Sequence, residues 1–322
     1  MSNEQKSVKI QDLKWGALLW YIHLHFFGVY GIWLIFTVAK WKTAFFTIFL
    51  TILGYLGVTA GAHRLWAHRA YEATWSLKLF LMLAHTLTGV GPIYDWVLMH
   101  RLHHKYYGTD KDPYNHKKGF LYSHYVANFL SWDAYLEEMA VEIDMRDMQL
   151  DYFVYLQKLL YWPLFIVFGV MLPLNAPLEY WDESMTASAV ITGLLRFAIM
   201  VNISWLVHSG LIIWSAEGKK IPANDLSIFF VKRTFWPAYH YMVTWDWKCG
   251  EFGGYGNEFA TTFIKVSYEF GLVKDLLTSD TEDIREMLDQ LAKKKITLES
   301  GLEKLKEIAV YNAKKQRLEV QM

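Results

Sequence analysis

Apolar runs long enough to cross a membrane constrain the fold of this chain more than any other feature. They occupy residues 17–39, 43–62, 159–178 and 185–214, and a short connection joins the two members of each pair. A helix needs about 20 mostly apolar residues to cross a bilayer, and inside the membrane its backbone must satisfy its own hydrogen bonds. The sequence therefore predicts an all-α integral membrane protein with four transmembrane helices.

The even number of spans places both termini on the same side of the membrane. The long stretches outside the spans carry many Lys and Arg residues, which concentrate on the cytosolic side of membrane proteins. We therefore expect both termini in the cytosol, together with a helical cap formed by residues 63–158 and 215–277. The predicted membrane domain covers residues 1–277, and residues 278–322 form a charged helical tail.

The start of the tail has the pattern of an amphipathic helix. Ser279 and Glu282 have the spacing of a capping box, in which each side chain bonds the backbone N–H of the other residue. Ile284, Leu288 and Leu291 recur at helical spacing. The pattern therefore predicts a helix capped by Ser279.

Charge and cysteine content exclude two further classes of protein. Lys plus Arg and Asp plus Glu each number 32, so no overall basic field favours nucleic acid as a partner. The single cysteine, Cys249, rules out an intrachain disulfide framework and suits a protein that faces the cytosol. The 15 Trp and 20 Tyr residues are typical of the aromatic belts at membrane surfaces, where membrane lipids surround the protein.

Two histidine clusters lie next to the apolar runs. The first contains His63 and His68, and the second contains His100, His103 and His104. On a helix, the residues of the second cluster fall at i, i+3 and i+4 and share one face. Histidine is the commonest metal ligand, and imidazole suits iron, copper and zinc. The clusters therefore predict a metal site in the cap.

These motifs resemble those of a known family over nearly the whole chain. The stretch His63-Arg-Leu-Trp-Ala-His68 looks like a first histidine box, and Asp95-Trp96 leading to His100-Arg-Leu-His-His104 looks like a second. Trp245-Asp246-Trp247, followed by Gly250-Glu251-Phe252-Gly253, is similar to the segment after a third box. The chain thus resembles the membrane-bound acyl-CoA desaturases of animals, of the stearoyl-CoA, delta-9-like type, as a divergent paralogue.

The resemblance implies a fold, a reaction and partners. It implies a cytosolic cap that holds two irons above four spans, in the endoplasmic reticulum membrane, and a tunnel for the acyl chain of a fatty acyl-CoA or another lipid. The implied reaction uses molecular oxygen to place a cis double bond in the acyl chain, as in unsaturated fatty acid biosynthesis. Its electrons come from cytochrome b5 and its reductase. Trp96 and Trp205 are the expected aromatic residues of the substrate site.

The ligand set departs from the family pattern in one region. The resemblance carries over His63, His68, His100, His103, His104 and His240 as metal ligands. At three positions where the family has histidine, this chain has Ile212, Pro237 and Tyr241. His208 replaces a family asparagine one turn before Ile212, so His208 or Tyr241 could take over a lost ligand role. The family geometry implies that the losses fall on one metal, and that the other keeps His63, His68, His100, His240 and one of His103 or His104.

The positions that resemble the CoA site have also changed. Family members carry Arg-Asp before the second box, an Arg-Lys pair near the cap and Trp-Arg-Asn at the start of the first span. Here these positions are Leu98-Met99, Ser131-Trp132 and Trp15-Gly16-Ala17. Arginine is the best donor to phosphate, so the resemblance implies weaker binding of a CoA ester.

Three functions follow as hypotheses from these observations. The first is an acyl-CoA desaturase with a degenerate third histidine box. The second is a catalytically impaired relative that binds lipid or regulates active desaturases. The third is an oxygenase that hydroxylates its substrate. The motifs favour the family strongly, and the missing ligands leave catalytic competence open between the three.

Overall fold

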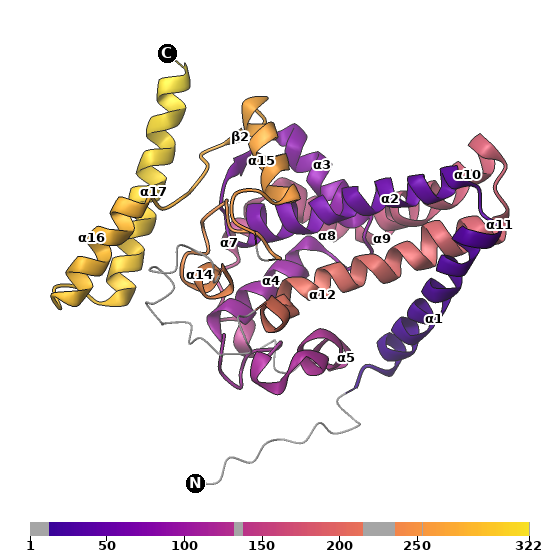
Figure 1. The fold of residues 1–322 in the computed structure, drawn as a ribbon, viewed down its shortest axis with the longest axis horizontal. Helices are drawn as coiled ribbons and strands as arrows, with labels where there is room; N and C mark the ends of the chain where they lie inside the picture. The colour runs from indigo at the N-terminus through magenta and orange to yellow at the C-terminus, as the bar shows by residue number, and fades with distance from the viewer. Residues whose placement is uncertain (1–12, 132–137, 215–235, 253, 322) are drawn as a thin grey trace, which may run out of the picture.

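Four long helices form the body of the molecule in the computed structural model (Figure 1). The structure describes residues 13–131, 138–214, 236–252 and 254–321. Within these residues, four helices are long and apolar enough to cross a membrane, namely Trp15–Thr37, Trp41–Ala67, Tyr161–Trp181 and Met185–Gly210. The predicted all-α fold with four candidate membrane helices is therefore confirmed.

Three of the four spans contain a π-helical turn. The first span is the α-helix α1 (Trp15–Thr37). The others consist of α2 (Trp41–Leu56) with the π-helix η2 (Gly57–Ala67), of α9 (Tyr161–Leu164) with η5 (Phe165–Met171) and α10 (Leu172–Trp181), and of α11 (Met185–Ala187) with η6 (Ser188–Leu195) and α12 (Arg196–Trp214). Such π-helical segments are frequent at functional sites, and η2 carries the first histidine of the first cluster.

The spans expose apolar side chains outward and pack through small residues inward. Phe26 and Phe36 on α1 are 69% and 84% exposed, as lipid-facing side chains would be. On the inner face, a Cβ placed at Gly31 would lie 2.9 Å from the Cβ of Leu195. Small residues let helix backbones approach closely where lipid removes the hydrophobic drive to associate, so α1 packs tightly against η6.

A buried arginine joins two spans and the cap inside the bundle. Arg196 donates to the carbonyls of Thr192, Leu87 and Gly169 at 2.5–2.7 Å, and its guanidinium lies 4.3 Å from the Phe197 ring. A charged side chain in a membrane needs such internal partners. Arg196 therefore acts as a crosslink between η5, α12 and the end of α3 (Trp75–Thr86).

The two short connections between spans meet at one end of the bundle. The Glu183 carboxylate accepts from the Thr43 hydroxyl at 2.5 Å and from the Lys40 backbone N–H at 2.9 Å. The Lys40 ammonium donates to the carbonyls of Trp181 and Asp182. Both connections are thus held together far from the histidine clusters, as the right side of Figure 1 shows.

The cap covers the opposite end of the spans. Its helices are α3, α4 (Ile93–Lys105), α5 (Ala127–Phe129), α7 (Arg146–Leu150), α8 (Tyr152–Leu159), α14 (Trp236–Met242) and α15 (Phe259–Glu269), with the short turns η3 (His116–Lys118) and η4 (Tyr122–Val126). Strand β1 (Glu72–Ala73) pairs antiparallel with β2 (Val273–Lys274). Arg101 on α4 donates to the Trp66 carbonyl and to the Asp147 carboxylate, which ties α4 to η2 and α7.

The tail consists of α16 (Thr281–Ala292) and α17 (Leu298–Gln321), the yellow pair of helices in Figure 1. Leu305 and Ala309 of α17 share a hydrophobic cluster with Tyr239 of α14 and with Trp245, which follows α14. The predicted capping box is wrong, because Asp280 precedes α16 and no side chain caps it. The Ser279 hydroxyl instead accepts from the Trp245 indole N–H at 3.2 Å. A tertiary hydrogen bond therefore replaces the predicted capping bond to the helix backbone.

Candidate metal centre

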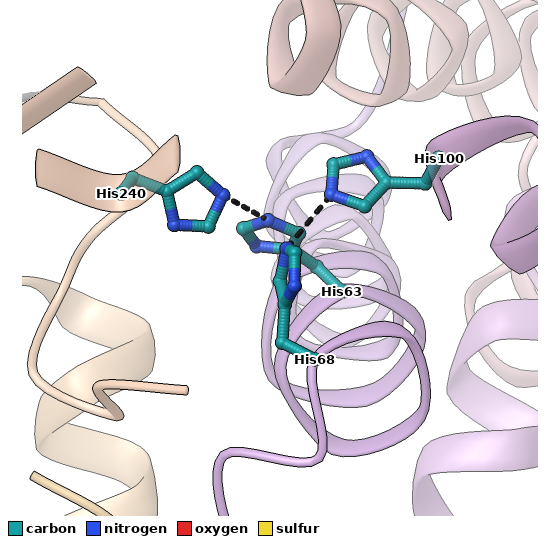
Figure 2. A group of neighbouring side chains, drawn as sticks. All are labelled: His63, His68, His100 and His240. Carbon is teal, nitrogen blue, oxygen red and sulfur yellow. Dashed lines mark hydrogen bonds between the residues drawn. The ribbon is translucent and has the colours of Figure 1, made fainter. Parts of the chain in front are cut away.

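Four histidines from three distant segments meet at the cap end of the bundle. His63 lies in η2 and His68 follows it, while His100 lies in α4 and His240 in α14. One ligand atom from each lies within 4.8 Å of the others. Figure 2 shows the four rings pointing toward a common centre, with His63 and His240 joined at 3.3 Å and His68 and His100 at 2.9 Å between their Nε2 atoms.

The donor set of this four-histidine cluster fits a metal ion. Two nitrogens bound to one metal at about 2.0–2.1 Å stand roughly 3–4 Å apart, which agrees with the spacing of the cluster. Burial, followed by the neighbouring histidines, lowers the pKa of His68, His100 and His240 well below the ordinary value. The rings are therefore neutral at physiological pH, and their converging lone pairs can bind a cation without first losing protons.

A buried carboxylate orients the His63 ring. The Nδ1–H of His63 donates to Oε1 of Glu251 at 2.7 Å, which leaves the Nε2 lone pair facing the cluster. Arg64 donates to both oxygens of the same carboxylate, at 2.7 and 2.6 Å. Burial alone would raise the pKa of Glu251, but Arg64 and His63 lower it below the ordinary value. A carboxylate behind a ligating histidine fixes the tautomer and strengthens the ligand.

His104 lies beside the four-histidine cluster. Its ring centre is 4.5 Å from that of His68, 4.7 Å from His100 and 4.9 Å from His240. Among the described residues, neither ring nitrogen of His104 has a hydrogen-bond partner. His104 is therefore placed to complete the ligand set, whereas its neighbour on α4, His103, turns to the other side.

Both ring nitrogens of His103 are already hydrogen-bonded. Its Nδ1–H donates to Oδ1 of Asp112 at 2.7 Å, and its Nε2 accepts from the Tyr241 hydroxyl at 2.5 Å. Burial, with Tyr107 and Asp112 nearby, raises the pKa of Tyr241 well above the ordinary value, so this phenol keeps its proton. His208 lies flat against Tyr114, with ring centres 4.0 Å apart.

Two further positions at which the family has histidine carry no imidazole beside His103. Ile212 is half-buried on α12, and Pro237 belongs to α14, although its side chain lies outside the described part of the structure. His208 is an imidazole beside His103 whose ring nitrogens have no hydrogen-bond partner among the described residues, and with the Nε2 of His103 bonded to Tyr241 it is too small a ligand set for a second iron. The four-histidine cluster therefore fits a metal ion, and the residues around His103 do not.

The two tryptophans expected at the substrate site are both buried. Trp96 stacks on His100, with ring centres 5.1 Å apart and planes inclined by 14°, and its indole N–H donates to the Ser204 hydroxyl. Trp205 on α12 is enclosed by aromatic rings of α1, η4 and α5, including Tyr21 at 4.9 Å. Trp96 thus lies directly against a histidine of the four-histidine cluster. Of the altered CoA positions, Ser131 and Trp15-Gly16-Ala17 are described, and Trp132 lies outside the described residues.

A hydrogen-bonded chain beside Trp205 links α1, α12 and η4. Asn202 donates to Nε2 of His25 at 2.8 Å and accepts from Nε2–H of His124 at 3.0 Å. The other nitrogen of His124 bonds the Ser209 hydroxyl at 2.8 Å. A buried polar group that loses its partner costs about 1–3 kcal/mol, so this chain holds α1 and η4 against α12.

We expect Asn202→Leu to lower the thermal stability of the purified protein, because it leaves His25 and His124 without this partner. The loss should be about 1–3 kcal/mol, read as a lower midpoint of thermal unfolding in detergent. Asn175→Leu is the matched control, since Asn175 lies exposed on α10 and its side chain donates to the Met171 carbonyl of its own span. Equal midpoints for the two variants would show that the chain contributes no stability.

Sequence reasoning missed three residues that surround the histidines. Glu251 and Asp112 accept from His63 and His103, and Tyr107 stacks on Tyr241 with ring centres 3.6 Å apart. Glu251 stands inside the stretch Gly250-Glu251-Phe252-Gly253 that carries the family resemblance, and Asp112 follows the second box in the stretch Thr109-Asp110-Lys111-Asp112-Pro113, which also resembles the family. The resemblance is therefore the signal that could have found both carboxylates. Nothing in the sequence pairs Tyr107 with Tyr241.

Comparison with known proteins identifies the family. The chain is 34% identical over 284 residues to the acyl-CoA delta-9 desaturase of Acheta domesticus, covering 87% of this chain and 79% of that protein. It is 36% identical to the acyl-CoA delta-12 desaturase of Tribolium castaneum over 84% of this chain and 77% of the relative. It is 32% identical to the human stearoyl-CoA desaturase over 84% and 76% of the two chains.

No model of a protein family matches the chain. The matches to these relatives nevertheless cover more than four fifths of this chain and more than three quarters of each relative. The buried histidine cluster and the four candidate membrane helices agree with this assignment. The chain belongs to the acyl-CoA desaturase family.

Proposed function

We propose that this protein is a membrane-bound acyl-CoA desaturase that uses molecular oxygen to introduce a cis double bond into a fatty acyl chain. One observation carries the proposal, which is the convergence of His63, His68, His100 and His240 at one end of four candidate membrane helices. The relatives named as acyl-CoA desaturases support the reaction and the class of substrate.

The proposed metal is iron, held by His63, His68, His100, His104 and His240. When bound, it would supply the oxygen chemistry that removes hydrogen from an unactivated methylene, which no side chain can do alone. The chain itself holds the ligands in place. Glu251 orients His63, and Trp96 covers one face of the His100 ring. Such supporting contacts decide the precision of a metal site.

The proposal extends to the surroundings of the protein. We place it in the endoplasmic reticulum membrane, with both termini and the cap in the cytosol and with cytochrome b5 and its reductase as electron donors. The many Lys and Arg residues of the long stretches outside the spans support this orientation. In the same proposal residues 1–277 form the catalytic membrane domain, and residues 278–322 form a tail that packs beside α14.

Trp96 and Trp205 are proposed to line the acyl site. Trp96 supports this role because it lies between His100 and the Ser204 hydroxyl of the fourth span, so a chain beside it would also lie near the metal ligands. Trp205 supports the same role because it lies among the aromatic rings of Tyr21 and Phe129, which form an apolar wall beside α12. Aromatic and apolar walls are typical of sites that bury most of a ligand.

A second candidate function rests on the changed ligands. Ile212, Pro237 and Tyr241 stand where the family has histidine, and the Tyr241 hydroxyl bonds His103. Leu98-Met99 also replaces a charged pair expected at the CoA site. Together these changes favour a relative that binds lipid, or regulates other desaturases, without turning over substrate.

Expression in cells that lack their own desaturase separates the two functions. We expect the full chain to produce a new monounsaturated fatty acid by gas chromatography and mass spectrometry, and His68→Ala to produce none at equal membrane abundance. A hydroxylated fatty acid would favour the oxygenase hypothesis. Iron-loaded protein that binds acyl chains and forms no product at all would favour the lipid-binding relative.

A further inference from the structure

His103 and Tyr241 occupy the place where the family resemblance implies a second metal. His103 lies on α4 one turn after His100 and is fully buried, with none of its surface exposed. Its Nε2, the only nitrogen not bonded to Asp112, accepts the Tyr241 hydroxyl. A neutral imidazole has one acceptor nitrogen, so the lone pair that would bind a metal is already used.

The hydrogen bond is held in place from both sides. Oδ1 of Asp112 accepts the Tyr114 backbone N–H at 2.9 Å as well as His103, which fixes the carboxylate behind the ring. The Tyr241 ring stacks on Tyr107, with ring centres 3.6 Å apart, and its centre lies 4.7 Å from that of His104. Neither partner can swing away without breaking a stacked contact or a buried hydrogen bond.

The other imidazole nearby is also restrained. His208 lies flat on Tyr114, with planes inclined by 17°, and its ring centre is 5.6 Å from that of His103. Ile212 lies one turn after His208 on α12, at a position where the family has histidine. A metal beside His103 would therefore have the Tyr241 hydroxyl and the His208 imidazole as neighbours, and it would lack the three histidines that the family has at positions 212, 237 and 241, which leaves a poor donor set for iron.

We propose that this chain binds a single metal ion, at the four-histidine cluster, and that the Asp112–His103–Tyr241 chain fills the space of the second metal. The inference rests on the proposed function and specifies its metal centre. In this proposal the Tyr241 hydroxyl satisfies the buried Nε2 of His103, a role that the family resemblance implies for the second metal.

The test is a metal count on the full chain with a matched pair of variants. Purified protein is loaded anaerobically with excess ferrous iron, desalted and analysed for iron per chain. We expect about one iron in the wild type, close to none in His100→Ala and about one in His103→Ala. The pair is matched because both histidines are buried on α4, at 1% and 0% exposure.

Three further measurements keep the test decisive if His103→Ala fails to fold. Tyr241→Phe keeps the stacked ring and removes the hydroxyl, and we expect it also to bind about one iron. The oxidised wild type should give the electron paramagnetic resonance signal of an isolated ferric ion, whereas two coupled ferric ions give none. The triple variant Ile212→His, Pro237→His and Tyr241→His should gain iron above the wild-type count.

The outcomes separate this inference from the proposed function. Two irons in the wild type, with a silent resonance spectrum, would overturn the single-metal centre and leave the desaturase proposal standing. Loss of iron in His103→Ala with the fold intact would also overturn it. No iron in any preparation would instead contradict the proposed redox function itself.

Discussion

Replacing Glu251 with alanine is expected to remove most of the metal from the protein and to destabilise its fold. The carboxylate accepts from His63 Nδ1 and from two nitrogens of Arg64, and all three side chains are almost completely buried. Loss of one partner from a buried charged pair costs about 3–5 kcal/mol, because the other charge stays buried and uncompensated. Loss of a carboxylate behind a ligating histidine lowers metal affinity about 10–100-fold.

Two variants separate the contributions of charge and hydrogen bonding. Glu251→Gln keeps an acceptor for His63 and removes the charge that Arg64 needs, so it should keep more metal than Glu251→Ala while remaining destabilised. Glu258→Ala is the control, because Glu258 also lies near Arg64, at 3.7 Å, and does not bond His63. Iron per chain and the midpoint of thermal unfolding are the measurements. If Glu251→Ala held as much iron as Glu258→Ala, Glu251 would have no role in positioning His63.

Gly57→Ala is expected to have the second large effect, on the packing of the helix that carries His63. A Cβ at Gly57 would lie 2.2 Å from the backbone nitrogen of His85 and 2.4 Å from the carbonyl carbon of Ala84. Those atoms belong to the backbone of α3 and cannot rotate away, so η2 and α3 must separate. Overpacking of this kind costs about 1–3 kcal/mol or more, and the separation also displaces the start of η2.

The matched control for Gly57→Ala is Gly193→Ala. Gly193 lies in η6, another π-helical segment within a span, and a Cβ there would meet no atom within 4 Å. We expect a lower unfolding midpoint and less bound iron for Gly57→Ala, and values close to wild type for Gly193→Ala. Wild-type stability in Gly57→Ala would mean that α3 does not pack on η2 this closely.

The number and placement of the membrane helices were predictable because the signal is local. Each span is a long and mostly apolar segment, and the membrane favours a helix because a helix satisfies its own backbone hydrogen bonds. The histidine clusters were predictable for the same reason, since their spacing is visible within a few residues. The start of α16 shows the limit of such reasoning. Ser279 and Glu282 match a capping box, yet the Ser279 hydroxyl bonds Trp245, which is distant in the sequence.

The sequence left open whether His103 or His104 accompanies the first metal site, and their contacts explain why. Both are neighbours on one helix face, so spacing alone treats them alike. Asp112 and Tyr241 turn His103 away from the four-histidine cluster, while His104 keeps unpartnered nitrogens beside it. The choice depends on residues from two other segments, and no local pattern encodes it.

The sequence by itself determined a four-span helical membrane protein with metal-binding histidines and a family, because hydrophobic length and ligand spacing are properties of short stretches of chain. Only the tertiary structure decided which histidines converge, that Glu251 orients His63, and that Tyr241 bonds His103. The physical reason is that a metal site and its supporting hydrogen bonds depend on distances of a few ångströms between side chains from η2, α4 and α14. Packing of the whole bundle and cap sets those distances.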